Sequence, residues 1–390
     1  MVAGFLFSRS LLSIFTFGLG VNGLVGIHPR QWLKNKWWLA GVAWIAIYAI
    51  SWFWTEEKGN WNTRLEVKLP FLILPLAFAY LPRFTSRQLQ IITLGMGLLF
   101  AGSACYSLSF LIIDSEHYIT GYKFSHVLPT LPKFDHIRAS MATVLFIVWS
   151  VYAWPYLSTR RLRIVTAFIA IFLALFLHIL AAKSGLVSLY LFLLLYGSYL
   201  AFWRRKLIGL LLVVAIPLSV MFAIRFIPTF RERANYIGYS IYMLRQGDRS
   251  GNIGDIARLM SYKIAADLIK EQPLIGHGAG DAKAVMDREY LAKYPDVPEY
   301  GRLLPHNQFL IVALSCGVPA MLLFAIWVFM PLATISRNRN GFFFFLVWFI
   351  LFIQLMIEPV LEVQFGVFVY IFFLLLQKHE TDSPERVAHL

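Results

Sequence analysis

The chain has 390 residues, of which 59% are hydrophobic and only 14% are charged, and its formal net charge is +14. This composition excludes a soluble globular domain and is typical of an integral membrane protein. The positive charge does not indicate a nucleic-acid partner, because the basic residues stand in short clusters between apolar runs, as topology determinants do. Cys105 and Cys316 both lie within apolar runs, so they support neither a disulfide framework nor a metal site.

Apolar runs recur along the whole chain, and most are long enough to cross a hydrocarbon core of about 30 Å as a helix. In chain order we predict membrane spans at about 5–25, 37–55, 69–81, 88–113, 138–157, 163–182, 185–202, 207–227, 306–330, 341–358 and 360–377. The segment 69–81 is short and contains Pro75, which weakens it as a complete span. The expected fold is an all-α polytopic membrane protein with about 11–12 transmembrane helices.

The segments between these spans alternate in charge. The strongly basic ones are HPRQWLKNK, PRFTSRQ, STRRLR, RRK and SRNRN. Positively charged loops face the cytoplasm, which places the N-terminus outside. The outer side then receives 56–68, 114–137, the turn at Lys183, the long segment 228–305, and EPVLE at 358–362.

The segment 228–305 is the only long polar stretch, and it contains a predicted amphipathic helix that ends before Pro273. The apolar residues with helical spacing are Ile256, Leu259, Met260, Ile264 and Leu268. We expect this helix to lie along the membrane surface. The following PLIGHGAGD has glycines at alternate positions and predicts a tight irregular turn. A nucleotide-binding loop is not supported, because no strand precedes these glycines and no Lys-Ser/Thr follows them.

Polar and ionisable residues from separate segments converge on the predicted outer side. They are His136, Arg138, Lys183, Arg258, His306, Asn307, Glu358 and Glu362. Each has a structural alternative: Lys183 as a snorkelling side chain, Arg258 as an interfacial anchor, and His306 as a helix cap. The two glutamates, four residues apart and so on one helical face, can also serve only as ion-pair partners. Their convergence on one membrane face favours a shared functional site.

The residue types in this set suit one kind of chemistry. Arg138, Lys183 and Arg258 at headgroup level are suited to bind an anionic diphosphate, which arginine contacts bidentately. His306 beside them is suited to act as a general base toward a hydroxyl group. The combination predicts glycosyl transfer from a lipid-linked sugar diphosphate. The glutamates would orient either the histidine or the cations.

Gly317 follows His306 at a distance of three helical turns. In a continuous helix it would lie on the same face and roughly 16 Å deeper, at 1.5 Å per residue. A glycine at that depth opens a groove, either for a neighbouring helix or for a lipid tail below the diphosphate.

Several of these stretches together resemble the O-antigen ligase and polymerase superfamily of bacterial envelopes. HNQFLIVALSCG, residues 306–317, is similar to the ligase signature of a histidine, a small polar residue, nine residues and a glycine. ARLMSYKIAADLIKEQPLIGHGAGD resembles the family's stretch in its large periplasmic loop, with an arginine before an amphipathic helix and a glycine-rich turn. HIRASM, AAKSGLVSLY and EPVLEVQFGVF resemble further family segments. The likeness extends from about residue 66 onward.

The resemblance implies a C-type glycosyltransferase that moves a glycan from undecaprenyl diphosphate to an acceptor on the periplasmic side, by inversion and without a metal or cofactor. It assigns Arg258 to the diphosphate and His306 to activation of the acceptor. A second family arginine aligns with Lys183, which keeps the charge but loses the planar fork, so diphosphate binding would depend more on Arg138. Asn307, His136, Glu358, Glu362 and Gly317 are the expected supporting residues. The implied location is the bacterial inner membrane.

The resemblance implies one transmembrane catalytic domain at 1–380, including a periplasmic loop at 228–305, and a cytoplasmic tail at 381–390. The compact loop, with no appended soluble domain expected after residue 378, favours lipid A-core as acceptor. An O-antigen polymerase and a protein-glycosylating ligase share this layout and remain alternatives. A transporter of an anionic envelope precursor would need polar groups at the midplane and inner side, where His178 and Gln354 are isolated. A scaffold without chemistry would leave the one-sided cluster unexplained.

Overall fold

The computed structural model describes residues 1–24, 34–132, 135–247 and 254–381, and this part of the chain is helical without β-strands. The α-helices are α1 (Val2–Phe7), α2 (Arg9–Leu24), α4 (Lys36–Ile50), α5 (Lys58–Lys68), α6 (Pro70–Ala79), α7 (Ser86–Ile113), α8 (Ser115–Gly121), α9 (His136–Ala153), α10 (Arg160–Leu180), α11 (Lys183–Ser198), α12 (Leu207–Phe226), α13 (Pro228–Arg245), α14 (Gly254–Glu271), α15 (Ala282–Lys293), α16 (Gln308–Phe329), α17 (Arg339–Ile357) and α18 (Gln364–Thr381). The predicted all-α fold is confirmed. The predicted tail at 381–390 lies, apart from Thr381, outside the described residues.

Seven helical segments of the described chain are long and apolar enough to cross a membrane, which confirms a polytopic membrane protein. They are Ser86–Ile113, His136–Tyr156, Arg160–Leu180, Lys183–Trp203, Leu207–Phe226, Gln308–Thr334 and Arg339–Ile357. The other predicted spans correspond to shorter or more polar helices. At 69–81 the helix α6 has 10 residues, too few to cross about 30 Å. The first predicted span is divided at Ser8, whose backbone is extended.

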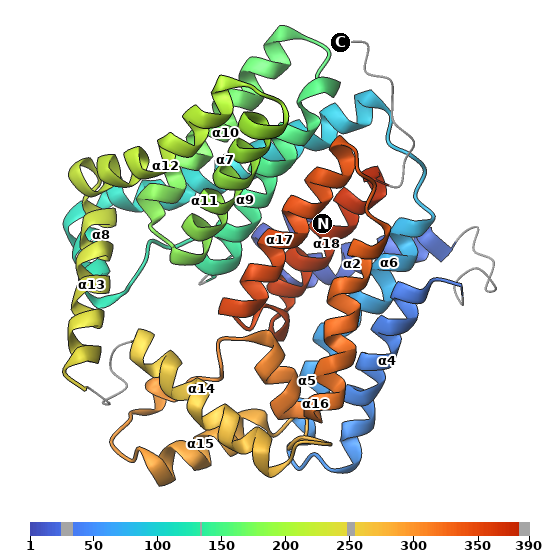
Figure 1. Cartoon of the computed structure of the whole chain (residues 1–390), viewed down its shortest axis with the longest axis vertical. Coiled ribbons are helices and arrows are strands. Elements are labelled where there is room, and N and C mark those ends of the chain that lie inside the picture. The colour runs from blue at the N-terminus through green and yellow to red at the C-terminus, as the bar shows by residue number, and fades with distance from the viewer. Residues whose placement is uncertain (25–33, 133–134, 248–253, 382–390) are drawn as a thin grey trace.

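The helices form two groups that meet along α9, α17 and α18. Figure 1 shows α7 and α9 to α12 in one group, and α2, α4, α6 and α16 to α18 in the other. α9 packs on α11 and α18, and α17 packs on α11 and α18. Most of the residues of α9 and α18 are buried, so these helices form the centre of the molecule.

The segment 228–305 forms α13, α14 and α15, and α14 and α15 lie together at one end of the molecule (Figure 1). The predicted amphipathic helix is confirmed as α14. Its apolar residues Ile256, Met260 and Ile264 are buried in a small core with Met286 of α15 and Leu314 of α16. The apolar face of α14 is thus covered by α15 and α16. The position of this helix along the membrane surface stays a prediction.

The predicted glycine-rich turn docks into a break in α16. Gly317 has φ of 84° and ψ of 168°, so the helix is interrupted there. The carbonyl oxygens of Leu314 and Ser315 accept hydrogen bonds from the N–H groups of His277 and Gly278, and the N–H of Val318 donates to Pro273. The backbone groups left unpaired at the break thus form hydrogen bonds with the turn. These bonds attach the 228–305 segment to the helical core.

Candidate functional site

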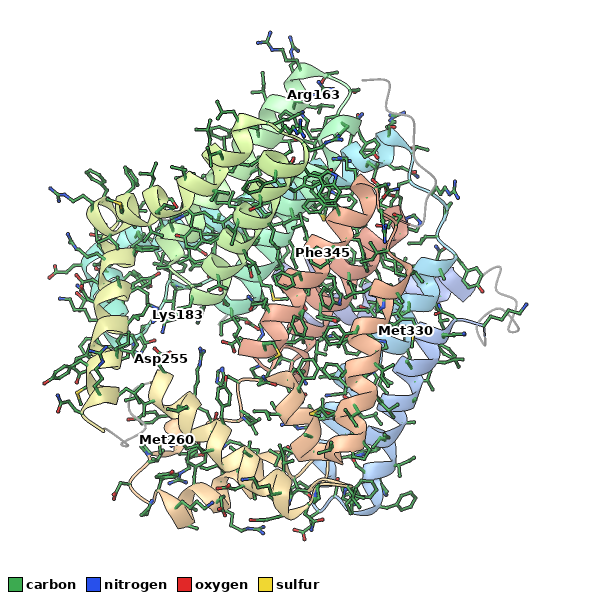
Figure 2. All side chains as sticks on the ribbon, in the orientation of Figure 1. Arg163, Lys183, Asp255, Met260, Met330 and Phe345 are labelled. Carbon is green, nitrogen blue, oxygen red and sulfur yellow. The ribbon has the colours of Figure 1, made fainter. Side chains whose placement is uncertain are left out.

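A cavity of about 260 Å³ lies where α9, α11, α13 and α14 approach the end of α17. It is lined by Ser125, His136, Ile137, Lys183, Ser184, Val187, Arg233, Tyr236, Gly254, Asp255, Arg258, Ile357 and Glu358. The structure therefore brings together four predicted site residues from four separate segments: His136, Lys183, Arg258 and Glu358. Figure 2 shows Lys183 and Asp255 close together, at the opposite end of the helices from Arg163.

Lys183 is the first residue of α11, after a tight turn in which Ala181 has a positive φ of 48°. A cation at a helix N-terminus opposes the helix dipole, so an anion is needed beside it. Asp255, in the first turn of α14, provides that anion, with its carboxylate oxygens 2.7 and 3.0 Å from Lys183 Nζ. Asp255 and Arg258 are three residues apart on one helical face, which directs both toward the cavity.

Glu358 joins Arg258 to His306. Arg258 Nη2 lies 2.8 Å from Glu358 Oε1, and His306 Nδ1 lies 3.0 Å from Glu358 Oε2. Burial raises the pKa of Glu358, but the hydrogen bond to His306 and the charge of Arg258 outweigh this effect, so its pKa lies below the usual value. An ionised carboxylate only accepts hydrogen bonds, so Nδ1 of His306 carries the proton. In the neutral ring Nε2 is then free to accept a proton.

Asn307 and Gln308 fix the chain beside His306. Asn307 caps α16 by accepting hydrogen bonds from the N–H groups of Phe309 and Leu310, and its Nδ2 donates to Met356. Asn307 thus holds the backbone rather than the His306 ring. Gln308, which is fully buried, donates to Glu362 Oε1 at 2.7 Å and accepts from Leu361 N at 2.8 Å. The sequence analysis did not identify Gln308.

Glu362 belongs to a separate buried cluster, with Arg64, Lys68 and Gln308. The two glutamates do not share a helical face as predicted, because Glu358 is extended, Pro359 follows it, and Val360–Glu362 is a 3-10 turn. Burial alone would raise the pKa of Glu362. The positive charges of Lys68 and Arg64 have the larger combined effect and lower this pKa to about 2. Glu362 therefore carries a charge that stabilises this connection between α17 and α18.

Arg138 and Gly317 lie outside the cavity lining. Arg138 is 3.4 Å from both Asp135 Oδ1 and the carbonyl oxygen of Pro359, so it holds the chain next to Glu358. Gly317 opens no groove for a helix or a lipid tail. A Cβ there would lie 2.2 Å from the carbonyl oxygen of Leu274, because the glycine-rich turn fills that space. The expectation of a continuous helix that leads from His306 to Gly317 is wrong.

Two charged cavity residues were missed by the sequence analysis, Asp255 of α14 and Arg233 of α13. The signal was weakest for Arg233. It stands in PTFRERANY, directly after an apolar run, where arginines are usually interfacial anchors. The available signal was its place in the same long outer segment as Arg258. Only the orientation of α13 distinguishes it from the exposed Arg231.

Comparison with known families gives one match. The O-antigen ligase family model matches residues 168–325, from α10 to α16. This region of the chain is similar to the O-antigen ligase family. The match confirms the resemblance to the O-antigen ligase superfamily and indicates a glycosyltransferase-type activity. No curated protein matches the chain significantly.

The matched region contains Lys183, Arg233, Asp255, Arg258 and His306. Glu358, which joins two of them, directly follows α17 and lies beyond the matched region. Among the described residues, no group of three or more His, Cys, Asp or Glu side chains is arranged to hold a metal ion. The positive charges near the cavity are instead those of lysine and arginine side chains.

Proposed function

We propose that this membrane protein is an inverting glycosyltransferase that moves a glycan from undecaprenyl diphosphate to a hydroxyl group of lipid A-core. The reaction takes place at the periplasmic face of the bacterial inner membrane. The observation that carries the proposal is the hydrogen-bonded chain from Arg258 through Glu358 to His306 beside a cavity lined by cations. In this proposal, 1–380 act as one catalytic domain, 228–305 form its periplasmic loop, and 381–390 are a cytoplasmic tail.

The donor diphosphate occupies the cavity, and Lys183 and Arg258 bind its phosphate oxygens. The planar guanidinium of an arginine can contact two phosphate oxygens at once, and the ammonium group of a lysine attracts them as a compact positive charge. His136 lines the same cavity, and Arg138 adds positive charge behind Glu358 through its contact with Pro359. These side chains stabilise the negative charge of the leaving diphosphate without a metal ion.

His306 activates the acceptor. Its Nε2 removes the proton of the acceptor hydroxyl while the hydroxyl oxygen bonds to the anomeric carbon of the donor. The bond from that carbon to the diphosphate oxygen breaks on the opposite face, which inverts the anomeric configuration. Undecaprenyl diphosphate leaves, and the proton on His306 passes to solvent. Ionised Glu358 stabilises the imidazolium that forms, and Asn307 and Gln308 hold the chain on which His306 stands.

The identity of the acceptor distinguishes the proposed activity from the other activities of the superfamily. The test incubates the purified protein with lipid-linked glycan and lipid A-core, and separately with lipid-linked glycan alone or with an acceptor protein. We expect glycan on lipid A-core. Extension of lipid-linked glycan would identify a polymerase, and glycan on protein would identify a protein ligase. No transfer in any of these incubations would contradict the proposed activity.

A further inference from the structure

Arg233 differs from the other cations around the cavity in its partners. Lys183 is paired with Asp255, and Arg258 with Glu358. Within the described part of the chain, Arg233 forms no ion pair with a carboxylate; its Nη1 donates to the hydroxyl oxygen of Ser125 at 2.6 Å. A cation without an anionic partner is costly in a largely buried place, so an anion in the cavity would have a favourable site.

The guanidinium of Arg233 has donor capacity left for such an anion. Its bond to Ser125 fixes the plane of the group through Nη1. Its Nε is buried and makes no hydrogen bond to the described residues. Nε and Nη2 form the remaining edge of the guanidinium, which is the edge that binds two oxygens of one phosphate. Arg233 therefore lines the cavity, and its Nε has no hydrogen-bond partner among the described residues.

We propose that Arg233 is a third ligand of the donor diphosphate and supplies the planar fork that Lys183 lacks. This inference rests on the proposed function, since it assigns the same cavity to the same diphosphate. The two arginines differ in what else they contact: Arg258 of α14 is paired with Glu358, which also contacts His306, whereas Arg233 comes from α13 and lines the same cavity. Arg233 is thus a residue that binds the donor.

The rest of the site supports this assignment through charge. Five ionised side chains line the cavity: Lys183, Arg233, Arg258, Asp255 and Glu358. The two carboxylates form ion pairs with Lys183 and Arg258, and among the described residues Arg233 has no carboxylate within ion-pair distance. A diphosphate that binds between these residues gains an arginine that needs no displacement of a carboxylate.

The experiment measures the affinity of the purified full-length protein for undecaprenyl diphosphate, together with transfer at saturating donor. Arg233→Ala should weaken binding by about tenfold or more, as the loss of a charge-assisted hydrogen bond predicts. Arg233→Lys keeps the positive charge but loses the planar fork. Its affinity for undecaprenyl diphosphate should lie between those of the wild type and Arg233→Ala. The matched control is Arg231→Ala: two residues earlier, Arg231 is exposed and lies about 200° around the same helix.

A second control separates binding from structure. Ser125→Ala removes the partner of Arg233 but keeps its charge, and should change the affinity by no more than about threefold. If Ser125→Ala weakens binding as much as Arg233→Ala does, the role of Arg233 is to hold the chain at Ser125 in place, and the inference fails. If Arg233→Ala and Arg233→Lys both bind normally while Arg258→Ala does not, the inference fails and the proposed function stands. Normal binding in all three variants would reject the donor site itself.

Discussion

Nδ1 of His306 lies 3.0 Å from Oε2 of Glu358, across 52 residues of sequence. This bond fixes the tautomer of the ring and directs Nε2 away from the carboxylate. Because the other oxygen of Glu358 accepts from Arg258, a single carboxylate connects the proposed acceptor base with a proposed donor ligand. Glu358 would thus hold the two halves of the proposed reaction in a fixed geometry.

Gln308 should affect turnover more than donor binding. Gln308→Leu leaves Glu362 Oε1 and Leu361 N without their partner, which loosens the chain that carries His306. We expect transfer to fall by about tenfold or more, with the affinity for undecaprenyl diphosphate unchanged. The exchange Gln308→Glu with Glu362→Gln restores an amide–carboxylate pair and should recover part of the activity. An equal loss in the exchange variant would contradict a positioning role.

Asp255 should compete with the proposed donor for Lys183. Asp255→Asn removes the carboxylate that now neutralises this ammonium group. Titration with undecaprenyl diphosphate should show roughly two- to fivefold tighter binding, the range expected for a partly exposed ion pair. The control is Asp267→Asn on the same helix, because Asp267 pairs with Lys293 away from the cavity. Weaker binding in Asp255→Asn would mean that Asp255 positions Lys183 instead.

The cluster around Glu362 should make stability depend on acidity. The pKa of Glu362 in the folded protein is about 2, against a usual value of 4.5. Its contribution to the free energy of unfolding is therefore complete above about pH 4.5 and is lost as the pH falls toward 2. Glu362→Gln leaves Arg64 and Lys68 without their anion. The thermal midpoint of this variant should lie below that of the wild type at neutral pH, and the difference should shrink on acidification. A difference that does not vary with pH would contradict the assignment.

Gly317 should be intolerant of any side chain. In Gly317→Ala the new Cβ meets the carbonyl oxygen of Leu274 at 2.2 Å, and φ of 84° is strained for alanine. The cost should be at least about 1–3 kcal/mol, with release of the glycine-rich turn from α16. Gly102→Ala in α7 is the control, because a Cβ there has nothing within 4 Å. Thermal unfolding of both variants tests this, and equal midpoints would contradict the docked arrangement.

The sequence predicted what depends on pattern, and it failed where tertiary packing decides. Helical spacing identified the buried face of α14, and the one-sided placement of Lys183, Arg258 and Glu358 anticipated their common cavity. Pro359 was a local signal that the sequence analysis did not use: a residue before proline favours an extended backbone, as Glu358 adopts, so the two glutamates were not to be placed on one helical face. The pattern could not show the break at Gly317, because that conformation depends on a turn some forty residues away.

Arg233 illustrates the same limit for charged residues. Two arginines at the start of α13 are equivalent in composition, and only the direction in which the helix turns them separates a cavity residue from an exposed one. Membrane anchoring explains both equally well from sequence. A structure is therefore needed to distinguish them.

The central claim is that His306 activates the acceptor and does not bind the donor. The most direct measurement compares transfer and undecaprenyl diphosphate binding in His306→Ala, with thermal unfolding as a check on folding. We predict that transfer falls by at least about a hundredfold, the lower end for loss of a general base, while donor affinity and the thermal midpoint stay close to the wild type. Full turnover in a folded His306→Ala protein would contradict the account.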